Sequence, residues 1–211
     1  MTRKTELSHA DLTARAIDEA ERLVRQGGRQ ALSMRLIAKA ASCASGTLYN
    51  VIGDLDDIIL RLNARTTAVL ADHLQQAAEA HDNTAERIFA MARAYVAVGE
   101  AEPELWSLLF EYRVPVGRGL PDWYHEILAR PIEGVHGAAR QGFRSDAECA
   151  DFVARLWTAL HGVVALSITA KLSILISKTS REFVDDLVEM HLRASGVAPG
   201  RDPPGAVFTN Q

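Results

Sequence analysis

The 211-residue chain has few of the features that mark disulfide-rich, secreted or membrane-spanning proteins. Its two cysteines, Cys43 and Cys149, form no CxxC pair and are too few for a disulfide framework, which favours a reducing compartment. No apolar run approaches the roughly 20 residues of a membrane span, and the first residues, MTRKTELSHADL, lack the apolar core of a signal peptide. These absences predict a cytoplasmic protein without a membrane partner.

Sequence motifs of enzymes and metal sites are also missing. The histidines include no HExxH pattern and no pair at i, i+4 spacing, and the chain has no GxSxG, P-loop or GxGxxG motif. We therefore expect no catalytic residues, no metal and no cofactor. A helical enzyme built from scattered carboxylates remains an alternative.

Charge is unevenly distributed along the chain. The net charge is −4, yet residues 1–65 hold ten Lys and Arg against eight Asp and Glu, while the remainder is acidic. A slightly basic end permits contact with phosphates without requiring it.

Apolar residues at helical spacing are abundant, whereas no segment alternates as a strand does and no NG or DG hairpin signal occurs. The pattern predicts an all-α fold of about nine helices. Within it, Pro131 is expected to kink or split its helix, and Asp54 has the position of an N-cap paired with Asp57. The predicted helices cover 9–26, 34–41, 45–52, 55–80, 84–100, 103–113, 121–141, 146–171 and 180–195.

The stretch SCASGTLYNVIGD, residues 42–54, suits a helix that enters a DNA major groove. Such a helix needs small or polar residues near its N-terminus so that the backbone can approach the duplex. Thr47 can bind phosphate, Asn50 can pair with a base edge, and Leu48 faces the core. The alternative is a helical hairpin buried inside a core, but this stretch has too few large apolar residues for a helix that is buried on all sides.

The longer segment LSMRLIAKAASCASGTLYNVIGDLDDIIL resembles the DNA-binding region of the TetR family of transcriptional regulators. The match spans about residues 10–65, and SMRLIA and SGTLY are its most specific parts. The resemblance implies a helix-turn-helix domain over 1–55 and a ligand-binding and dimerisation domain over 56–196. The Gly- and Pro-rich composition of residues 197–211 predicts a disordered tail. The resemblance also implies phosphate contacts from Ser33 and Arg35 and a groove-facing set made of Ser45, Gly46, Thr47, Tyr49 and Asn50.

The sequence departs from that family pattern at Ala44, Val51 and Leu55. Leu55 stands where the family commonly has a phosphate-binding Lys, and Asp56 and Asp57 follow it. We expect this acidic start to weaken DNA binding, because each lost phosphate contact removes about 0.9 from the salt slope. Cys43 lies at the turn, where a small buried hydrophobe is favoured over a redox switch.

Aromatic residues concentrate after residue 66, where a helical bundle can form a small-molecule site. WTALHG resembles the Trp-x-x-x-His-Gly signature of one TetR C-terminal subgroup. Each aromatic residue has ordinary core packing as its alternative. The expected ligand-binding residues are Tyr95, Trp106, Phe110, Trp123, Trp157 and His161.

The last two predicted helices are apolar on two faces, which indicates a second partner such as another copy of the chain. The expected dimer-interface residues are Phe152, Leu156, Leu160, Phe183, Leu187 and Met190. Together these features predict a homodimeric repressor that binds a near-palindromic double-stranded DNA operator. A small apolar or aromatic effector in the C-terminal bundle would release it. Alternatives are a TetR-like activator, or a helical small-molecule-binding or catalytic protein with a vestigial DNA-binding region.

Overall fold

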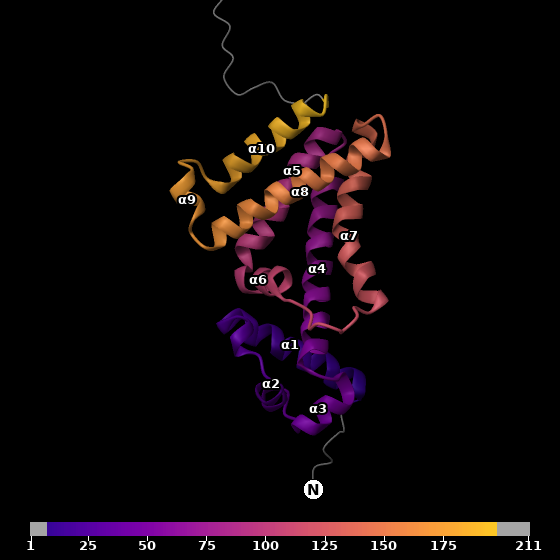
Figure 1. Ribbon diagram of the computed structural model, residues 1–211, viewed down its shortest axis with the longest axis vertical. Helices are drawn as coiled ribbons and strands as arrows, with labels where there is room; N and C mark the ends of the chain where they lie inside the picture. Colours follow the sequence, from indigo (N-terminus) through magenta and orange to yellow (C-terminus); the bar gives the residue numbers. More distant parts are fainter. Residues whose placement is uncertain (1–7, 198–211) are drawn as a thin grey trace, which may run out of the picture. The chain divides into compact units, whose positions relative to one another are not determined.

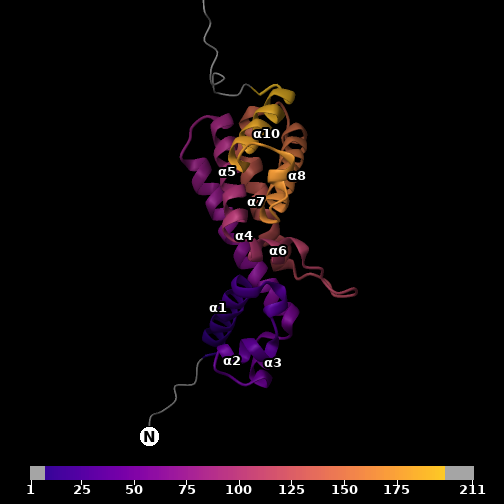
Figure 2. The same ribbon diagram turned by 90° about the vertical axis from the view of Figure 1, so that its left-hand side faces the viewer.

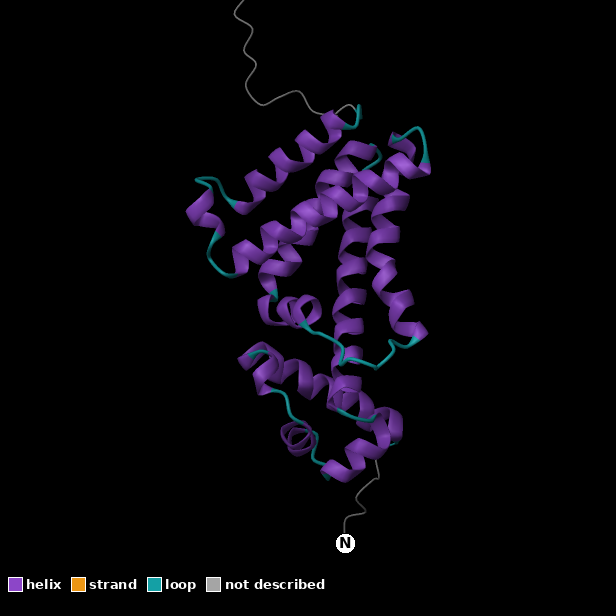
Figure 3. Ribbon diagram, viewed as in Figure 1, coloured by secondary structure: helices purple, strands orange, loops and turns teal. Residues whose placement is uncertain are grey.

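The computed structural model describes residues 8–197, and every regular element in that range is helical (Figures 1 and 3). The all-α prediction is therefore confirmed. The α-helices are α1 (His9–Gly27), α2 (Met34–Ala40), α3 (Ser45–Ile52), α4 (Leu55–Glu79), α5 (Thr84–Ala101), α6 (Pro103–Glu111), α7 (Asp122–Ala139), α8 (Asp146–Ile168), α9 (Leu172–Leu175) and α10 (Ser180–Ala194). Two 3-10 turns, η1 (Arg29–Ala31) and η2 (Arg140–Gly142), complete the described part.

The structure departs from the predicted helices at two places. One extra helix, α9, has four residues, and a single turn is too short to produce a periodic pattern. Pro131 does not split its helix, because α7 continues through it. The tail predicted to be disordered lies outside the described residues, apart from Val197.

The chain divides into two compact units, one formed by residues 8–69 and 102–128 and the other by 70–101 and 129–197. The first unit extends well beyond the predicted boundary at residue 55. It does so because α6 packs against α1 and places Leu105 and Leu108 in the same core as Leu48. Helices α4 and α7 each contribute to both units.

The first unit is organised by α1, whose apolar side chains recur at helical spacing on its buried face. Ser8 and Asp11 form a capping box at its start, and Gly28, with φ +63°, ends it. Arg65 of α4 forms ion pairs with Asp18 and Glu21 of α1, at 2.6 and 2.9 Å. The short helices α2 and α3 thus pack against α1, which ion pairs hold against α4.

The second unit contains α5, α8 and α10 packed on one another (Figure 2). Arg93 of α5 donates two hydrogen bonds of 2.6 Å to Asp185 of α10, in the bidentate geometry that favours guanidinium–carboxylate pairs. Among the described residues, α8 alone is long and apolar enough to cross a membrane. Its side chains Phe152 and Leu156 are buried in this bundle, as expected of a core helix.

Candidate nucleic-acid interface and effector cavity

The turn between α2 and α3 is held by its own backbone and by α1. Ser42 has φ +58°, and its hydroxyl accepts a hydrogen bond of 3.2 Å from Arg15 of α1. The N–H of Cys43 donates to the carbonyl of Ala38 at 2.9 Å. Cys43 packs against the core, which agrees with the small-hydrophobe interpretation. The direction of α3 is thus fixed locally.

Helix α3 has one buried and one exposed face. Leu48 is fully buried and Ile52 nearly so, and both anchor the helix on the core of the first unit. Tyr49, by contrast, is 51 % exposed although it is a large aromatic residue. The predicted groove-facing set lies outside the core: Gly46, Thr47, Tyr49 and Asn50 are exposed and Ser45 is half-buried.

The N-terminal end of α3 is open to an approaching anion. No side chain caps this end, where Ala44 is the N-cap. A Cβ added at Gly46 would meet no atom within 4 Å, so the surface there is low and open. Helix N–H groups without capping partners, together with the helix dipole, favour binding of phosphate. This end of α3 combines that property with polar side chains.

The two predicted phosphate contacts have different settings. The Ser33 side chain caps α2 by accepting a hydrogen bond of 3.2 Å from the N–H of Leu36. A hydroxyl that accepts in this way can still donate its own proton to a phosphate oxygen. Arg35 is exposed on the first turn of α2. Both residues therefore lie at one helix start, and Ser33 also has a structural role.

The junction of α3 with α4 is a tight, acidic turn. Gly53 has φ +106°, and a Cβ placed there would lie 2.1 Å from a carboxylate oxygen of Asp57. The N–H of Asp54 donates to Asp57 at 2.9 Å, and the N–H of Asp57 donates to Asp54 at 3.0 Å. The predicted pairing of these two residues is confirmed.

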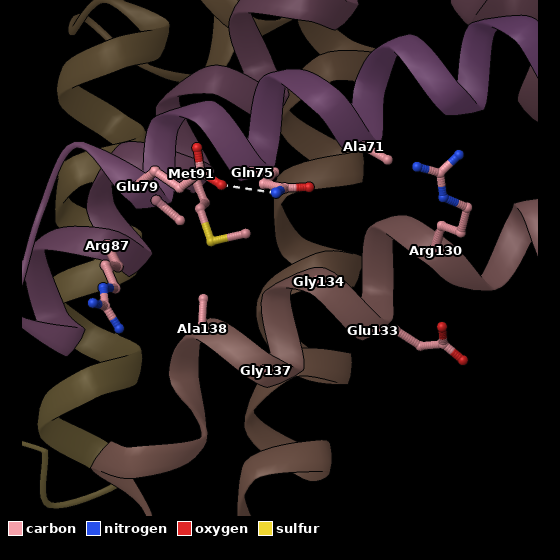
Figure 4. A pocket seen from close by; sticks show the side chains of 11 residues that line it. Ala71, Gln75, Glu79, Arg87, Met91, Arg130, Glu133, Gly134, Gly137 and Ala138 are labelled. Atoms are coloured by element: carbon pink, nitrogen blue, oxygen red, sulfur yellow. Dashed lines mark hydrogen bonds between the residues drawn. The ribbon is translucent and has the colours of Figure 1, made fainter.

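A cleft of about 490 Å³ opens between α4, α5 and α7 of the second unit (Figure 4). Two glycines in the interior of α7, Gly134 and Gly137, form part of its wall, and a Cβ on either would meet open space. Arginine and glutamate side chains around the opening of the cleft give it both positive and negative charge. The polar lining residues are Gln75, Glu79, Arg87, Arg130 and Glu133. The sequence analysis did not predict this cleft, although two glycines three residues apart inside a predicted helix indicate a place where the helix surface lacks side chains.

Met91 of α5 lines this cleft and also a small inner cavity of apolar residues. Tyr95 and Trp157 line the inner cavity in an edge-on contact, with ring centroids 4.6 Å apart. The Tyr95 hydroxyl lies 3.3 Å from Nδ1 of His161. Burial raises the pKa of Tyr95 and lowers the pKa of His161, so both rings are favoured in their neutral forms. The inner cavity, at about 20 Å³, has room for a water molecule but not for a larger ligand.

The structure brings together only half of the predicted ligand-binding set. Tyr95, Trp157 and His161 cluster in the second unit, whereas Trp106, Phe110 and Trp123 belong to the first unit. Trp106 is buried in α6 with its ring 4.6 Å from that of Phe110. The two groups of aromatics separate because α6 folds onto the core of α1, which the pattern of aromatics does not reveal.

The predicted dimer interface is corrected in the same way. The α8 residues of that set, Phe152, Leu156 and Leu160, are at most 4 % exposed and belong to the core of this chain. They lie on the helix that packs against α5 and α10 of the same chain, so they are not available to a partner. On α10, Met190 is 57 % exposed, and Phe183 and Leu187 are half-buried.

Potential metal ligands do not gather anywhere in the described part of the chain. Among residues 8–197, no cluster of three or more His, Cys, Asp or Glu side chains could hold a metal ion.

A short polar helix exposed on a helix-turn-helix core is the arrangement with which helix-turn-helix proteins reach the DNA major groove. Residues 88–191 match the family model described as the tetracyclin repressor-like C-terminal domain. Residues 88–191 of the chain therefore belong to the C-terminal domain family of TetR-like transcriptional regulators.

Known proteins and structures are similar over most of the chain. The HTH-type transcriptional regulators Rv1816 of Mycobacterium tuberculosis and Mb1846 of Mycobacterium bovis are each 25% identical over 133 residues, 62% of this chain. Those matches span 57% of the relatives' length. A protein of unknown function from Rhodococcus sp. RHA1 has a TM-score of 0.77 at 18% identity, covering 92% of this chain and 99% of that one. The TetR family regulator PfmR from Thermus thermophilus has a TM-score of 0.60 at 17% identity, covering 85% and 97%.

Proposed function

We propose that the chain is a homodimeric, effector-responsive transcriptional repressor that reads a near-palindromic operator with α3 and acts in the cytoplasm. The observation that carries this proposal is the division of α3 into a buried and an exposed face. Leu48 fixes the helix from inside, and Tyr49 and Asn50 remain accessible to a duplex. We infer a regulator rather than an enzyme, because the polar residues of α3 suit recognition.

Each residue of α3 has a distinct role in the proposed complex. Asn50 pairs with a base edge, for which adenine offers a matching donor and acceptor in the major groove. Thr47 and the open N–H groups at the start of α3 bind phosphates, which fix the register of the protein on the duplex. Arg35, exposed at the start of α2, adds a second phosphate contact.

A dimer supplies the second reading helix. Two successive major grooves on one side of DNA are about 34–36 Å apart, so a palindromic site needs two copies of α3 at that spacing. The outer face of α10, where Met190 is exposed and Phe183 and Leu187 are half-buried, supports this pairing. Helix α8 does not supply the predicted large residues to this pairing, because Phe152, Leu156 and Leu160 lie in the core of the chain.

The effector occupies the cleft beside Gly134, because the adjoining inner cavity, at about 20 Å³, has room for no more than a water-sized molecule. An apolar part of the effector packs against Met91 and Ala138. Its polar groups pair with charged residues of the rim such as Arg87 and Glu133. To shift the protein decisively from its DNA-binding state, such a molecule must bind the other state more tightly by about 5.5 kcal/mol.

The test of DNA recognition uses the wild-type protein and duplex fragments from upstream of its own gene. We expect fluorescence anisotropy to show selective binding to one fragment, with two chains bound per site. Selective binding should persist against excess unrelated DNA at about 200 mM salt, where non-specific contacts weaken. Binding to every fragment alike would contradict the proposal.

Filling the cleft should separate effector binding from folding. Gly134→Leu adds a side chain where a Cβ meets nothing within 4 Å, and it replaces a helical glycine that costs about 1 kcal/mol. We therefore expect a more stable protein that binds the anionic, apolar dye 1-anilinonaphthalene-8-sulfonate less well, with unchanged DNA affinity. Dye fluorescence, urea unfolding and anisotropy measure the three effects.

The matched control is Ala154→Leu, which narrows a separate groove between α7 and α8. Dye binding should be retained in this variant. A loss of dye in Ala154→Leu but not in Gly134→Leu would place the ligand in that other groove and contradict the proposed effector site.

A further inference from the structure

The three aspartates at the start of α4, Asp54, Asp56 and Asp57, are partly compensated by one arginine. Arg118, on the loop between α6 and α7, donates hydrogen bonds of 2.9 and 2.7 Å to the two carboxylate oxygens of Asp54. It also donates to Asp57, and its guanidinium lies 3.5 Å from Asp56. One arginine, distant in the sequence, therefore faces all three aspartates. Arg118 itself is largely covered, with its side chain 26 % exposed.

These aspartates have a structural reason to be there. Asp54 and Asp57 satisfy each other's backbone N–H groups at the start of α4, a position where the helix dipole favours negative charge. Burial raises the pKa of Asp54, but the N–H of Asp57 and the guanidinium of Arg118 together lower it more, and the net pKa lies below the ordinary value. Asp54 is therefore charged at neutral pH.

The same charges lie close to the proposed DNA-reading residues. Asp54 follows Asn50 by four positions, most of them within α3, so the two residues are separated by about 10 Å or less. That separation is comparable with the Debye length of about 10 Å at roughly 0.1 M salt. Uncompensated carboxylates at this distance would repel the phosphates that flank a bound groove.

We propose that Arg118 is an affinity-determining residue that makes the acidic α3–α4 turn compatible with DNA by cancelling part of its charge. The inference rests on the proposed DNA-binding function and adds a residue outside the helix-turn-helix to it. It also revises the expectation that Asp56 and Asp57 simply weaken binding. The arginine supplies locally the positive charge that a lysine at position 55 would otherwise provide.

The experiment measures operator affinity by anisotropy at about 50 mM and about 200 mM salt. Arg118→Ala should bind on the order of tenfold more weakly at the lower salt, because like charges are then exposed to the phosphates. The deficit should shrink at the higher salt as screening increases. Arg113→Ala is the matched control, since it removes one charge from the same loop at an exposed residue for which the described structure shows no ion pair. Its affinity should stay within about twofold of wild type.

A charge-matched rescue separates electrostatics from structure. The double variant R118A/D56N restores the wild-type net charge of the cluster and leaves the Asp54–Asp57 pair intact. We expect it to recover most of the lost affinity. A salt-independent loss without recovery, or equal affinities of Arg118→Ala and Arg113→Ala, would overturn the inference while wild-type binding still upheld the proposed function.

Folding is followed by circular dichroism for every variant. Should Arg118→Ala fail to fold, Asp56→Asn in the wild-type background provides the measurement, with several-fold tighter binding at about 50 mM salt expected. Unchanged affinity of that variant would overturn the inference. Failure of the wild type to select any fragment would instead remove the proposed function, and the inference with it.

Discussion

Asn50→Ala should lower the affinity for the operator by about 5- to 150-fold, which corresponds to the roughly 1–3 kcal/mol of a bidentate base contact. Asn50 is exposed on α3, and alanine is the better helix former, so the substitution removes recognition without weakening the helix. The measurement is anisotropy with the selected fragment and with an unrelated fragment. Selectivity between the two fragments should collapse, while weak non-specific binding persists.

Gln76→Ala, on the exposed face of α4 in the second unit, is the control for this result. It should bind like the wild type. Full selectivity in Asn50→Ala and in Tyr49→Ala together would show that α3 does not read the groove, and would contradict the central proposal.

Leu48→Ala should destabilise the protein by about 2–5 kcal/mol, the usual cost of removing a buried leucine side chain. Leu48 is fully buried in the core that α1, α2 and α4 share, and it holds α3 on the first unit. Operator binding should fall together with stability, because α3 then loses its fixed direction. Urea unfolding and anisotropy on the same samples measure both quantities.

Tyr49→Ala is the neighbouring comparison, since it also truncates a large side chain but one that is 51 % exposed. It should change the unfolding free energy by about 0.5 kcal/mol or less while impairing DNA binding. Equal destabilisation by the two substitutions would mean that Tyr49, too, belongs to the core. The pair therefore separates the residue that positions α3 from a residue that α3 presents.

Local sequence chemistry alone predicted most of the helices and the residues that begin them. Ser33 caps α2, and Asp54 pairs with Asp57 at the start of α4, because both contacts join residues three apart in the chain. The buried Leu48 and the exposed polar residues of α3 were also predicted, whereas Ile52, which anchors the helix as well, was not. These features depend on neighbours in the sequence.

The tertiary structure decided which apolar residues are core, because that depends on distant segments. Leu156 and Leu160 had the spacing of an interface stripe, yet they are buried within the chain, since α8 packs against α5 and α10. Trp106 had the surroundings of a ligand-binding residue in the sequence, but it lies in the first unit because α6 folds back onto α1. Periodicity shows that a face is apolar and does not show what covers it.

The cleft beside Gly134 and the contact of Arg118 with Asp54 are likewise products of tertiary packing. The cleft exists because α4, α5 and α7 meet where α7 lacks side chains. Arg118 and Asp54 are 64 positions apart, and their charges alone do not reveal that they are partners. The sequence by itself thus determined the helices, their caps and the exposed polar face of α3, because local hydrogen bonds and periodicity control them. Only the packing of distant helices decided which apolar faces are core, where the cleft lies and which arginine pairs with the acidic turn.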